Sequence, residues 1–415
     1  MTVSPTLAIN EEIARRRAAG LQTIALGFGE ASIPVHPALL KAVSDHAGEA
    51  SYGPVAGTDE LRTAAAGYWE RRGLPTDADQ VVAGPGSKPL LYALLQAIGG
   101  PVALPRPSWV SYAAQASLLG VTAPMLATVP GHGGVPDPAL FDAEAARAAA
   151  VGSPLAAVLV TLPDNPTGTV ADPALVRAVT DVAERHELLI ISDEIYRDLV
   201  HSDDTLVLSP SEIAPERTIV TTGLSKNLAL GGWRIGVVRF PRSERADAIK
   251  TDVLTAASEI WSAPAHPVQQ AAAWAFTEPV ELSERIEDSR TLHGRIARAV
   301  AEQFTAAGAS VPPPAAGFYV YPNFDAYRDR LRERWAVETS DDLARVLLDV
   351  LGIATLPGTA FGDDPTTLSL RVATPMLYGT SDPQREAALA SGSPATLPWI
   401  AESLYVLHDA LTSLT

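Results

Sequence analysis

The 415-residue chain contains no cysteine, so neither a disulfide nor a thiolate can hold its fold or take part in its chemistry. Its apolar runs are interrupted by glycine, proline or charge well before the roughly 18 residues that a transmembrane helix requires. The first residues, MTVSPTLAINEEIARRR, lack the basic-then-apolar order of a signal peptide. These absences predict a cytoplasmic protein that does not enter a membrane.

Positive charge is also scarce. The chain has 31 lysine and arginine residues against 48 aspartate and glutamate residues, which gives a formal net charge of −17. The acidic residues are spread without long runs, so they favour solubility and argue against an anionic surface as a partner. We expect neither nucleic acid nor a membrane to bind this chain.

The length and the 47% hydrophobic content predict two domains. Short apolar runs alternate with amphipathic helical segments such as 173–186, which predicts an α/β fold with a mostly parallel sheet and helices on both faces. The predicted strands are 102–105, 155–163, 188–192, 217–223 and 234–240. After about residue 280 the pattern changes, so we predict a large domain of residues 45–285 and a smaller α+β domain built from 1–44 and 286–415.

The run GLSKNLALGGWRIG, residues 223–236, pairs a lysine with an arginine across a flexible turn. The amine of Lys226 could form a Schiff base if burial or nearby positive charge lowers its pKa from about 10.4. Arg234 could supply that charge while its planar guanidinium grips a phosphate. Gly231 and Gly232 would let the chain fold back between the two side chains. On these residues alone, a solvated surface lysine beside an ordinary turn is the more usual interpretation.

The same run resembles, position by position, the lysine motif of the class I/II aminotransferases, fold-type I enzymes that use pyridoxal 5′-phosphate (PLP) and form the aspartate aminotransferase superfamily. The resemblance extends over about residues 24–375, with six separated motifs in the expected order. It implies a PLP-dependent transferase-like fold, with a three-layer α/β/α large domain, and PLP as the cofactor. It also implies that Lys226 bonds to the cofactor and moves the proton of the substrate. No metal is expected.

The resemblance assigns the cofactor's phosphate to several segments. In GPGSKPLLYALLQAI, a glycine turn before a helix, it implies that Ser87 and Lys88 bind the phosphate, although such a turn alone is weak evidence. Arg234 is implied to bind it as well. Many relatives carry a serine three residues before the lysine, whereas this chain has Gly223, and Thr222 or Ser225 would have to compensate.

Four further residues are implied to surround the cofactor's ring. Trp109 would stack on the ring, although a tryptophan is more usually a core or interface residue. Asn165 and Tyr196 would bind the phenolic oxygen, with Asn165 also near the substrate, and Asp193 would pair with the pyridinium nitrogen. The family often has a cis peptide before the proline that follows this asparagine, here Pro166. Asp164, the residue before the asparagine, is given no role.

The resemblance also implies how the substrate is bound. Arg371, in the predicted strand LSLRVATP, would hold the α-carboxylate, and Gly29 would close over the same group. Tyr52 would reach across a homodimer interface to the phosphate in the neighbouring subunit.

These residues together predict an aminotransferase that moves an amino group from an amino acid to a 2-oxo acid or another carbonyl acceptor. The segment SEIWSAPAH offers no arginine to bind a second carboxylate, so we expect an apolar or aromatic side-chain pocket. The loop after Pro375 is long, and Met376, Leu377 and Tyr378 are expected at the substrate entrance. A PLP-dependent lyase, cyclase or condensing enzyme on the same scaffold is the alternative, and a binding protein without turnover is a third reading.

Overall fold

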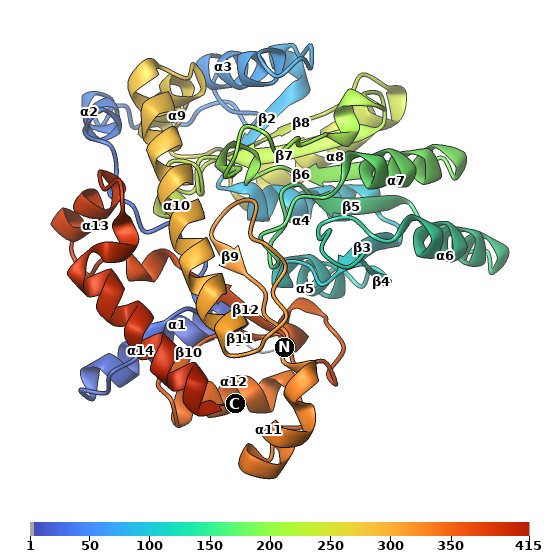
Figure 1. Ribbon diagram of the computed structural model, residues 1–415. Coiled ribbons are helices and arrows are strands. Elements are labelled where there is room, and N and C mark those ends of the chain that lie inside the picture. The colour runs from blue at the N-terminus through green and yellow to red at the C-terminus, as the bar shows by residue number, and fades with distance from the viewer. Residues whose placement is uncertain (1–3, 415) are drawn as a thin grey trace.

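The computed structural model describes residues 4–414 and centres on a seven-stranded sheet (Figure 1). Only β8 runs antiparallel to its neighbours, so the sheet is mostly parallel. Across the sheet the order is β2 (Val81–Gly84), β8 (Gly236–Arg239), β7 (Thr218–Gly223), β6 (Leu189–Asp193), β5 (Ala157–Thr161), β3 (Val102–Arg106) and β4 (Met125–Ala127). All five predicted strands are members of this sheet.

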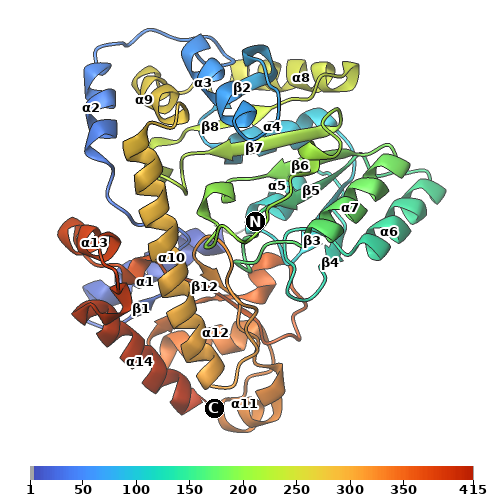
Figure 2. The same cartoon turned by 45° about the horizontal axis from the view of Figure 1, so that its top comes forward.

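Helices cover both faces of the sheet, which confirms the predicted three-layer α/β/α architecture (Figure 2). The alternation of side chains along β5 explains the layering: Leu159 packs against α4 (Ser87–Ile98) and α8 (Glu244–Ile260), whereas Val158 and Val160 pack against α6 (Pro138–Ala150) and α7 (Pro173–Arg185). A further layer at the β2 end consists of α2 (Pro37–Asp45), α3 (Asp59–Glu70) and α9 (His266–Phe276). The parallel strands are therefore buried on both sides.

A second body holds two small sheets. In one, β1 (Ile24–Ala25) pairs with β10 (Ile353–Ala354), and in the other the order is β11 (Leu356–Pro357), β12 (Leu370–Ala373) and β9 (Tyr319–Val320). Its helices are α1 (Pro5–Ala18), α11 (Arg328–Trp335), α12 (Ser340–Asp349), α13 (Asp382–Leu389) and α14 (Pro398–Leu414). The long helix α10 (Val280–Ala306) runs down from the large sheet into the core of this body (Figure 1). The domain boundaries at residues 45 and 285 stay a prediction.

No helix within residues 4–414 combines the length and the apolar character needed to span a membrane.

Gly168 joins the two bodies in the loop after β5. Its φ is +70°, and a Cβ atom there would lie 2.2 Å from the backbone oxygen of Tyr319. Its own carbonyl accepts hydrogen bonds from the backbone N–H groups of Ala315 and Ala316, at 2.8 and 3.0 Å. Only glycine allows this close approach of the two backbones without strain.

We predict that Gly168→Ala destabilises the protein by more than about 3 kcal/mol, because the left-handed backbone and the contact with a carbonyl that cannot move away both oppose a Cβ. The matched control is Gly152→Ala, at φ +74° with nothing within 4 Å of the added Cβ, which should cost only about 1 kcal/mol. Guanidinium denaturation of both variants measures the difference. Equal losses would show that the contact with Tyr319 contributes nothing.

Candidate active site

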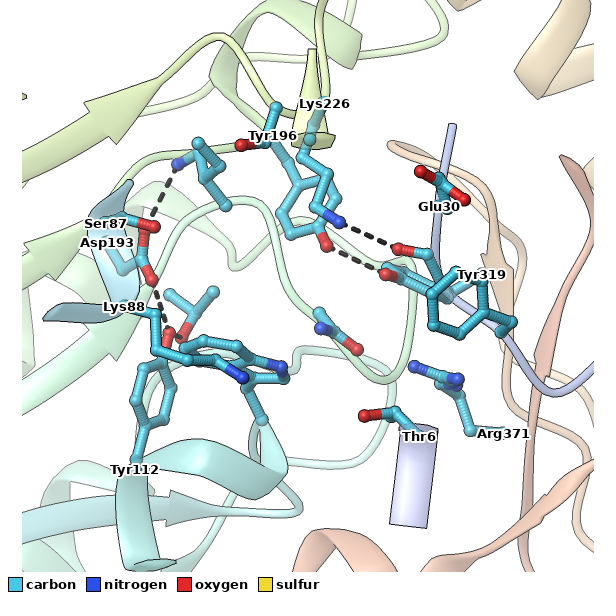
Figure 3. A pocket seen from close by; sticks show the side chains of 18 of the residues that line it. Thr6, Glu30, Ser87, Lys88, Tyr112, Asp193, Tyr196, Lys226, Tyr319 and Arg371 are labelled. Carbon is cyan, nitrogen blue, oxygen red and sulfur yellow. Dashed lines mark hydrogen bonds between the residues drawn. The ribbon is translucent and has the colours of Figure 1, made fainter. Parts of the chain in front are cut away.

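A cavity of about 510 Å³ lies where the carboxyl ends of the central strands face the second body (Figure 3). It is lined by all the predicted site residues except Tyr52. β5 and β6 end at its rim with Thr161 and Asp193, and β12 contributes Arg371 from the opposite side. The fold therefore gathers residues that are up to about 340 positions apart in the sequence, as expected for the carboxyl edge of a parallel sheet.

Lys226 extends into this cavity from the segment after β7. Its Nζ donates a hydrogen bond of 2.7 Å to the backbone oxygen of Gly29 and lies 5.9 Å from the centre of the Tyr196 ring. Burial lowers the pKa of Lys226 to about 8, with a further lowering from the charge of Arg371 and an opposing effect of Glu30. An appreciable fraction of this amine is thus neutral near pH 7, as a nucleophile requires.

Asp193 is a buried carboxylate with no basic partner among the described residues. Its Oδ2 accepts a hydrogen bond of 2.7 Å from the hydroxyl of Tyr112, which also lies 3.0 Å from the hydroxyl of Thr161. Burial raises the pKa of Asp193 to about 6, and the Tyr112 hydrogen bond opposes that rise. The carboxylate is oriented by neutral donors but lacks a cation.

Tyr196 follows β6 closely, three residues after Asp193, and lines the same cavity. Its hydroxyl is 2.8 Å from the hydroxyl of Tyr319, and both tyrosines are buried. The side-chain oxygen of Asn165 is also buried and has no hydrogen-bond partner among residues 4–414. These groups leave hydrogen-bonding capacity directed at the cavity rather than at the protein.

The start of α4 forms a compact polar corner with Arg234. A Cβ at Gly86 would lie 2.4 Å from Nη2 of Arg234, so only glycine lets the guanidinium approach this helix start. Ser87, the first residue of α4, and Ser225 both line the cavity. A helix N-terminus with unpaired N–H groups, a guanidinium and two hydroxyls is well suited to a phosphate.

Arg371 is almost completely buried, at 1% exposure. One nitrogen donates to the backbone oxygen of Gly27, the Nε has no partner among the described residues, and the guanidinium lies 5.0 Å from the ring centres of Tyr319 and Phe361. No carboxylate of residues 4–414 pairs with it. A buried cation of this kind is costly unless a ligand supplies the anion.

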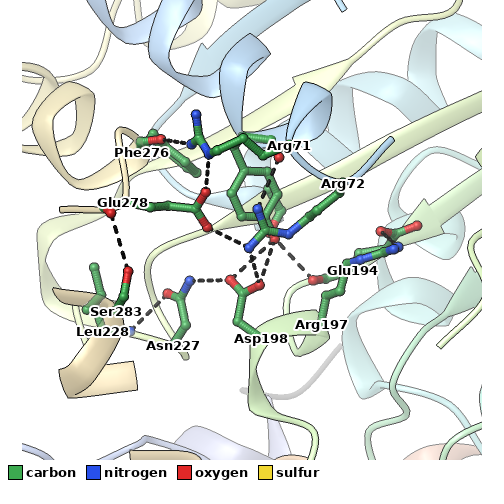
Figure 4. A network of polar contacts seen from close by, with 12 residues as sticks. Arg71, Arg72, Glu194, Arg197, Asp198, Asn227, Leu228, Phe276, Glu278 and Ser283 are labelled. Atoms are coloured by element: carbon green, nitrogen blue, oxygen red, sulfur yellow. Dashed lines mark hydrogen bonds and ion pairs between the residues drawn. The ribbon is translucent and has the colours of Figure 1, made fainter. Parts of the chain in front are cut away.

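A charged network outside the cavity holds the segment that carries Lys226 (Figure 4). The side-chain amide of Asn227 donates to Asp198 at 2.8 Å, and Arg72 pairs with Asp198 at 2.9 Å and with Glu278 at 2.6 Å. The network ties the segment after β7 to the residues that follow α3 and to the connection between α9 and α10. The backbone beside Lys226 is therefore held in place by contacts outside the cavity.

Lys88 and Tyr52 differ from the other predicted residues. The amine of Lys88 lies 5.1 Å from the Trp109 ring centre without an acidic partner among the described residues, and its pKa is lowered by burial and by the nearby charge of Arg234. Tyr52 is 94% exposed and does not reach the cavity of its own chain.

The sequence profile described as "Aminotransferase class I and II" matches residues 22–379. The chain belongs to this family.

Known proteins are similar to this chain over nearly its whole length. A probable aspartate/prephenate aminotransferase of Rhizobium leguminosarum bv. phaseoli is 30% identical over 401 residues, which covers 93% of this chain and 94% of that protein. The aspartate aminotransferase of Geobacillus stearothermophilus is 32% identical over 391 residues, covering 90% and 93%. The structure of the Thermus thermophilus aspartate aminotransferase with maleate superposes with a TM-score of 0.81 at 27% identity, covering 99% of this chain and 97% of that one.

As a member of this family, the protein is a PLP-dependent aminotransferase. The residues of the cavity fit each part of the cofactor. The unpaired carboxylate of Asp193 suits a pyridinium nitrogen, the helix start beside Arg234 suits the phosphate, and the partly neutral amine of Lys226 suits the aldehyde. The cavity therefore contains a suitable residue for the ring nitrogen, the phosphate and the aldehyde of the cofactor.

Several residues of this aminotransferase site were missed by sequence reasoning. Tyr112 and Tyr319 contact Asp193 and Tyr196 from 81 and 123 residues away, and tyrosines in apolar runs gave no signal of this. Glu30 was visible in the GFGEAS motif, one residue after Gly29, but its position beside the lysine depends on tertiary structure.

Two expectations for this aminotransferase were wrong. Leu377 and Tyr378, expected at the substrate entrance, are buried in the core of the second body, where the Tyr378 hydroxyl lies 2.6 Å from Nδ1 of His293. The free energy gained by burying these large side chains draws them into the core, although they follow Arg371 closely in the sequence. Met376 is half-buried beside Ser32, and its place at the entrance stays a prediction. The peptide before Pro166 is not cis, since the cis X–Pro peptides of the described residues precede Pro107 and Pro163.

We predict that Lys226 of the cofactor-free aminotransferase titrates near pH 8 and that two variants move this pKa in opposite directions. Glu30→Gln should lower it, because the lost negative charge no longer stabilises the ammonium form. Arg371→Met should raise it, because the lost positive charge no longer opposes that form. Each shift should be about one pH unit or less.

Acetylation of Lys226 as a function of pH, followed by mass spectrometry, measures these values because only the neutral amine reacts. Shifts of the same sign in both variants would contradict the assignment of opposite electrostatic effects.

Proposed function

We propose that this enzyme transfers the amino group of an α-amino acid to a 2-oxo acid, with the α-carboxylate of each substrate bound by Arg371. The observation that carries the proposal is a fully buried guanidinium without an anion that faces the same cavity as the amine of Lys226. Gly29 supports it, because a Cβ there would lie 3.2 Å from Nη1 of Arg371 and would block the space beside the guanidinium. Donor and acceptor then share one carboxylate site in turn.

The remaining residues divide the work of this reaction. Bound PLP supplies an electron sink when the Cα–H bond of the amino acid breaks. With PLP bound, Lys226 would hold its aldehyde carbon through the side-chain amine, and the same amine, when free, would carry the proton of the substrate. Asp193, oriented by Tyr112, would keep a proton on the ring nitrogen. Trp109, which lines the same cavity, would cover one face of the ring and exclude water from it.

Binding of the cofactor's oxygens completes the proposal. Tyr196 and Asn165 would hydrogen-bond the phenolic oxygen of the ring and stabilise its deprotonated form. Arg234, Ser87 and Ser225 would bind the phosphate at the start of α4. A cofactor held at its ring and at its phosphate would keep its reacting carbon beside the amine of Lys226.

We further propose a homodimer in which Tyr52 binds the phosphate of the neighbouring subunit. Its 94% exposure supports this role, because a large aromatic side chain is rarely left in water. The cytoplasmic location stays a prediction.

The side-chain pocket carries the finer part of the proposal. Leu7, Phe28 and Ile195 line the cavity and fit the apolar or aromatic pocket predicted from the sequence. However, the amine of Lys88 lies in the same cavity and has no acidic partner in the described part of the chain, and the names of several relatives include aspartate and prephenate. We propose that Lys88 binds a second carboxylate on the donor's side chain instead of the phosphate, so that a dicarboxylic amino acid is preferred to a purely apolar one.

Lys226→Ala should reduce transamination by more than about 10³-fold, because it removes both the covalent anchor and the proton carrier. Lys41→Ala, at an exposed lysine paired with Asp45, is the matched control and should keep full activity. The absorbance of the bound cofactor should change in the first variant only. An unaltered spectrum in Lys226→Ala would overturn the assignment of the anchor.

The same enzyme, mixed with single amino acids and no acceptor, should convert its cofactor to the amine form. Release of ammonia, or a new product with the cofactor back in its aldehyde form, would favour the lyase, cyclase or condensing alternative.

Lys88→Met should raise KM for aspartate about 10-fold or more and leave KM for phenylalanine nearly unchanged, because only aspartate loses a charge-assisted hydrogen bond. Steady-state kinetics with both donors, together with the dissociation constant of PLP, test this. Weaker PLP binding with equal effects on both donors would instead place Lys88 at the phosphate, as the sequence resemblance implies.

A further inference from the structure

Tyr319 bridges the two bodies inside the cavity (Figure 3). It lies on β9 in the second body, yet its hydroxyl is 2.8 Å from the hydroxyl of Tyr196, which follows β6 of the large sheet. The two rings meet edge to face, with centres 5.6 Å apart and an interplanar angle of 75°. Both side chains are almost completely buried, so water does not compete for this hydrogen bond.

The same side chain also touches the proposed carboxylate site. The guanidinium of Arg371 lies 5.0 Å from the centre of the Tyr319 ring, and a Cβ at Gly29 would lie 2.5 Å from the Tyr319 hydroxyl. β9 pairs with β12, the strand of Arg371, through the partners Tyr319 and Ala373. Tyr319 and Arg371 are therefore carried by one small sheet and keep their relative positions.

The proton arrangement between the two tyrosines follows from their valence. A phenol has one proton to donate. If the hydroxyl of Tyr196 donates its hydrogen bond to the ring oxygen of the cofactor, its oxygen can only accept a hydrogen bond from the hydroxyl of Tyr319. A hydroxyl that accepts a hydrogen bond becomes a stronger donor, because such chains polarise one another.

We propose that Tyr319 is a positioning residue for catalysis, whose hydroxyl donates to Tyr196 and thereby directs and strengthens the hydrogen bond from Tyr196 to the cofactor's ring oxygen. This inference rests on the proposed role of Tyr196. It links the sheet that carries Arg371 to the acid–base properties of the cofactor.

The charged groups that face this pair come from four segments. Arg371 on β12 lies beside both tyrosines, Asp193 ends β6, Asp164 lies in the loop after β5, and Lys226 follows β7. None of them is removed by Tyr319→Phe, which keeps the ring and loses only the hydroxyl. The variant therefore isolates one hydrogen bond.

The test compares the holoenzyme with Tyr319→Phe, Tyr196→Phe and the double variant, by the pH midpoint of the bound cofactor's absorbance without substrate. A hydrogen bond to the ring oxygen stabilises the deprotonated form, so weakening it moves the midpoint upward. Tyr196→Phe should produce the larger rise and Tyr319→Phe a rise of about half a pH unit. The double variant should match Tyr196→Phe alone, because Tyr319 acts through Tyr196.

Tyr321→Phe is the matched control. This buried tyrosine, two positions along, donates to Asp363 at 3.0 Å outside the cavity, so its loss should leave the midpoint unchanged. In Tyr319→Phe, kcat should fall several-fold with KM for the donor little changed, since Arg371 is untouched.

The possible outcomes separate the two proposals. No shift in Tyr196→Phe would overturn the role of Tyr196 and, with it, that of Tyr319. A shift in Tyr196→Phe without one in Tyr319→Phe would overturn only the role of Tyr319. So would an additional shift in the double variant, or a shift of the same size in Tyr321→Phe.

Discussion

Two opposite charges are buried in one cavity of this aminotransferase, and neither has a partner of the other sign among residues 4–414. Asp193 has neutral hydrogen-bond donors only, and Arg371 has a carbonyl and two aromatic rings. Each such group costs several kcal/mol of folding free energy, so the surrounding structure has to stabilise it. The two side chains do not form an ion pair with each other. Such a pair would leave neither charge available to a cofactor or a substrate. A cofactor cation and a substrate anion can then each find a preformed counter-charge.

The fold meets this constraint by placing the two charges on different bodies. Asp193 ends β6, a strand with apolar layers on both faces, which keeps its carboxylate dry and its pKa raised. Arg371 lies within β12, whose neighbours β9 and β11 hold it from both sides. The contact of Gly168 with Tyr319 and the bridge between Tyr319 and Tyr196 set how far apart the bodies can lie. The packing of the two bodies against each other therefore fixes the relative positions of the two charges.

The sequence predicted what depends on local pattern. The central strands were visible because buried parallel strands are continuous apolar runs, and Asp193 was visible because it stands at the end of one. Contacts between distant segments were not visible. Tyr112 looks like any core tyrosine of a helix, and Tyr378 seemed to follow Arg371 into the site until the turn at Pro375–Leu377 buried it against His293. Side-chain direction after a turn is set by tertiary packing, which a single sequence does not encode locally.

Gly223, the least typical residue of the lysine run, has a steric explanation. It pairs with Gly236 across the β7–β8 ladder, and a Cβ at 223 would lie 2.8 Å from the backbone oxygen of Ile235. A Cβ at Gly236 would in turn lie 2.6 Å from the backbone nitrogen of Ser87, at the start of α4. Of these two positions, only Gly236 lies against the start of α4, so its missing side chain lets the N–H groups of this helix approach the corner beside Arg234. A serine at 223 would instead have to displace the backbone of β8 at Ile235 and Gly236. Gly223 is thus explained by the close packing of β7 on β8, the strand on which the helix start rests through Gly236.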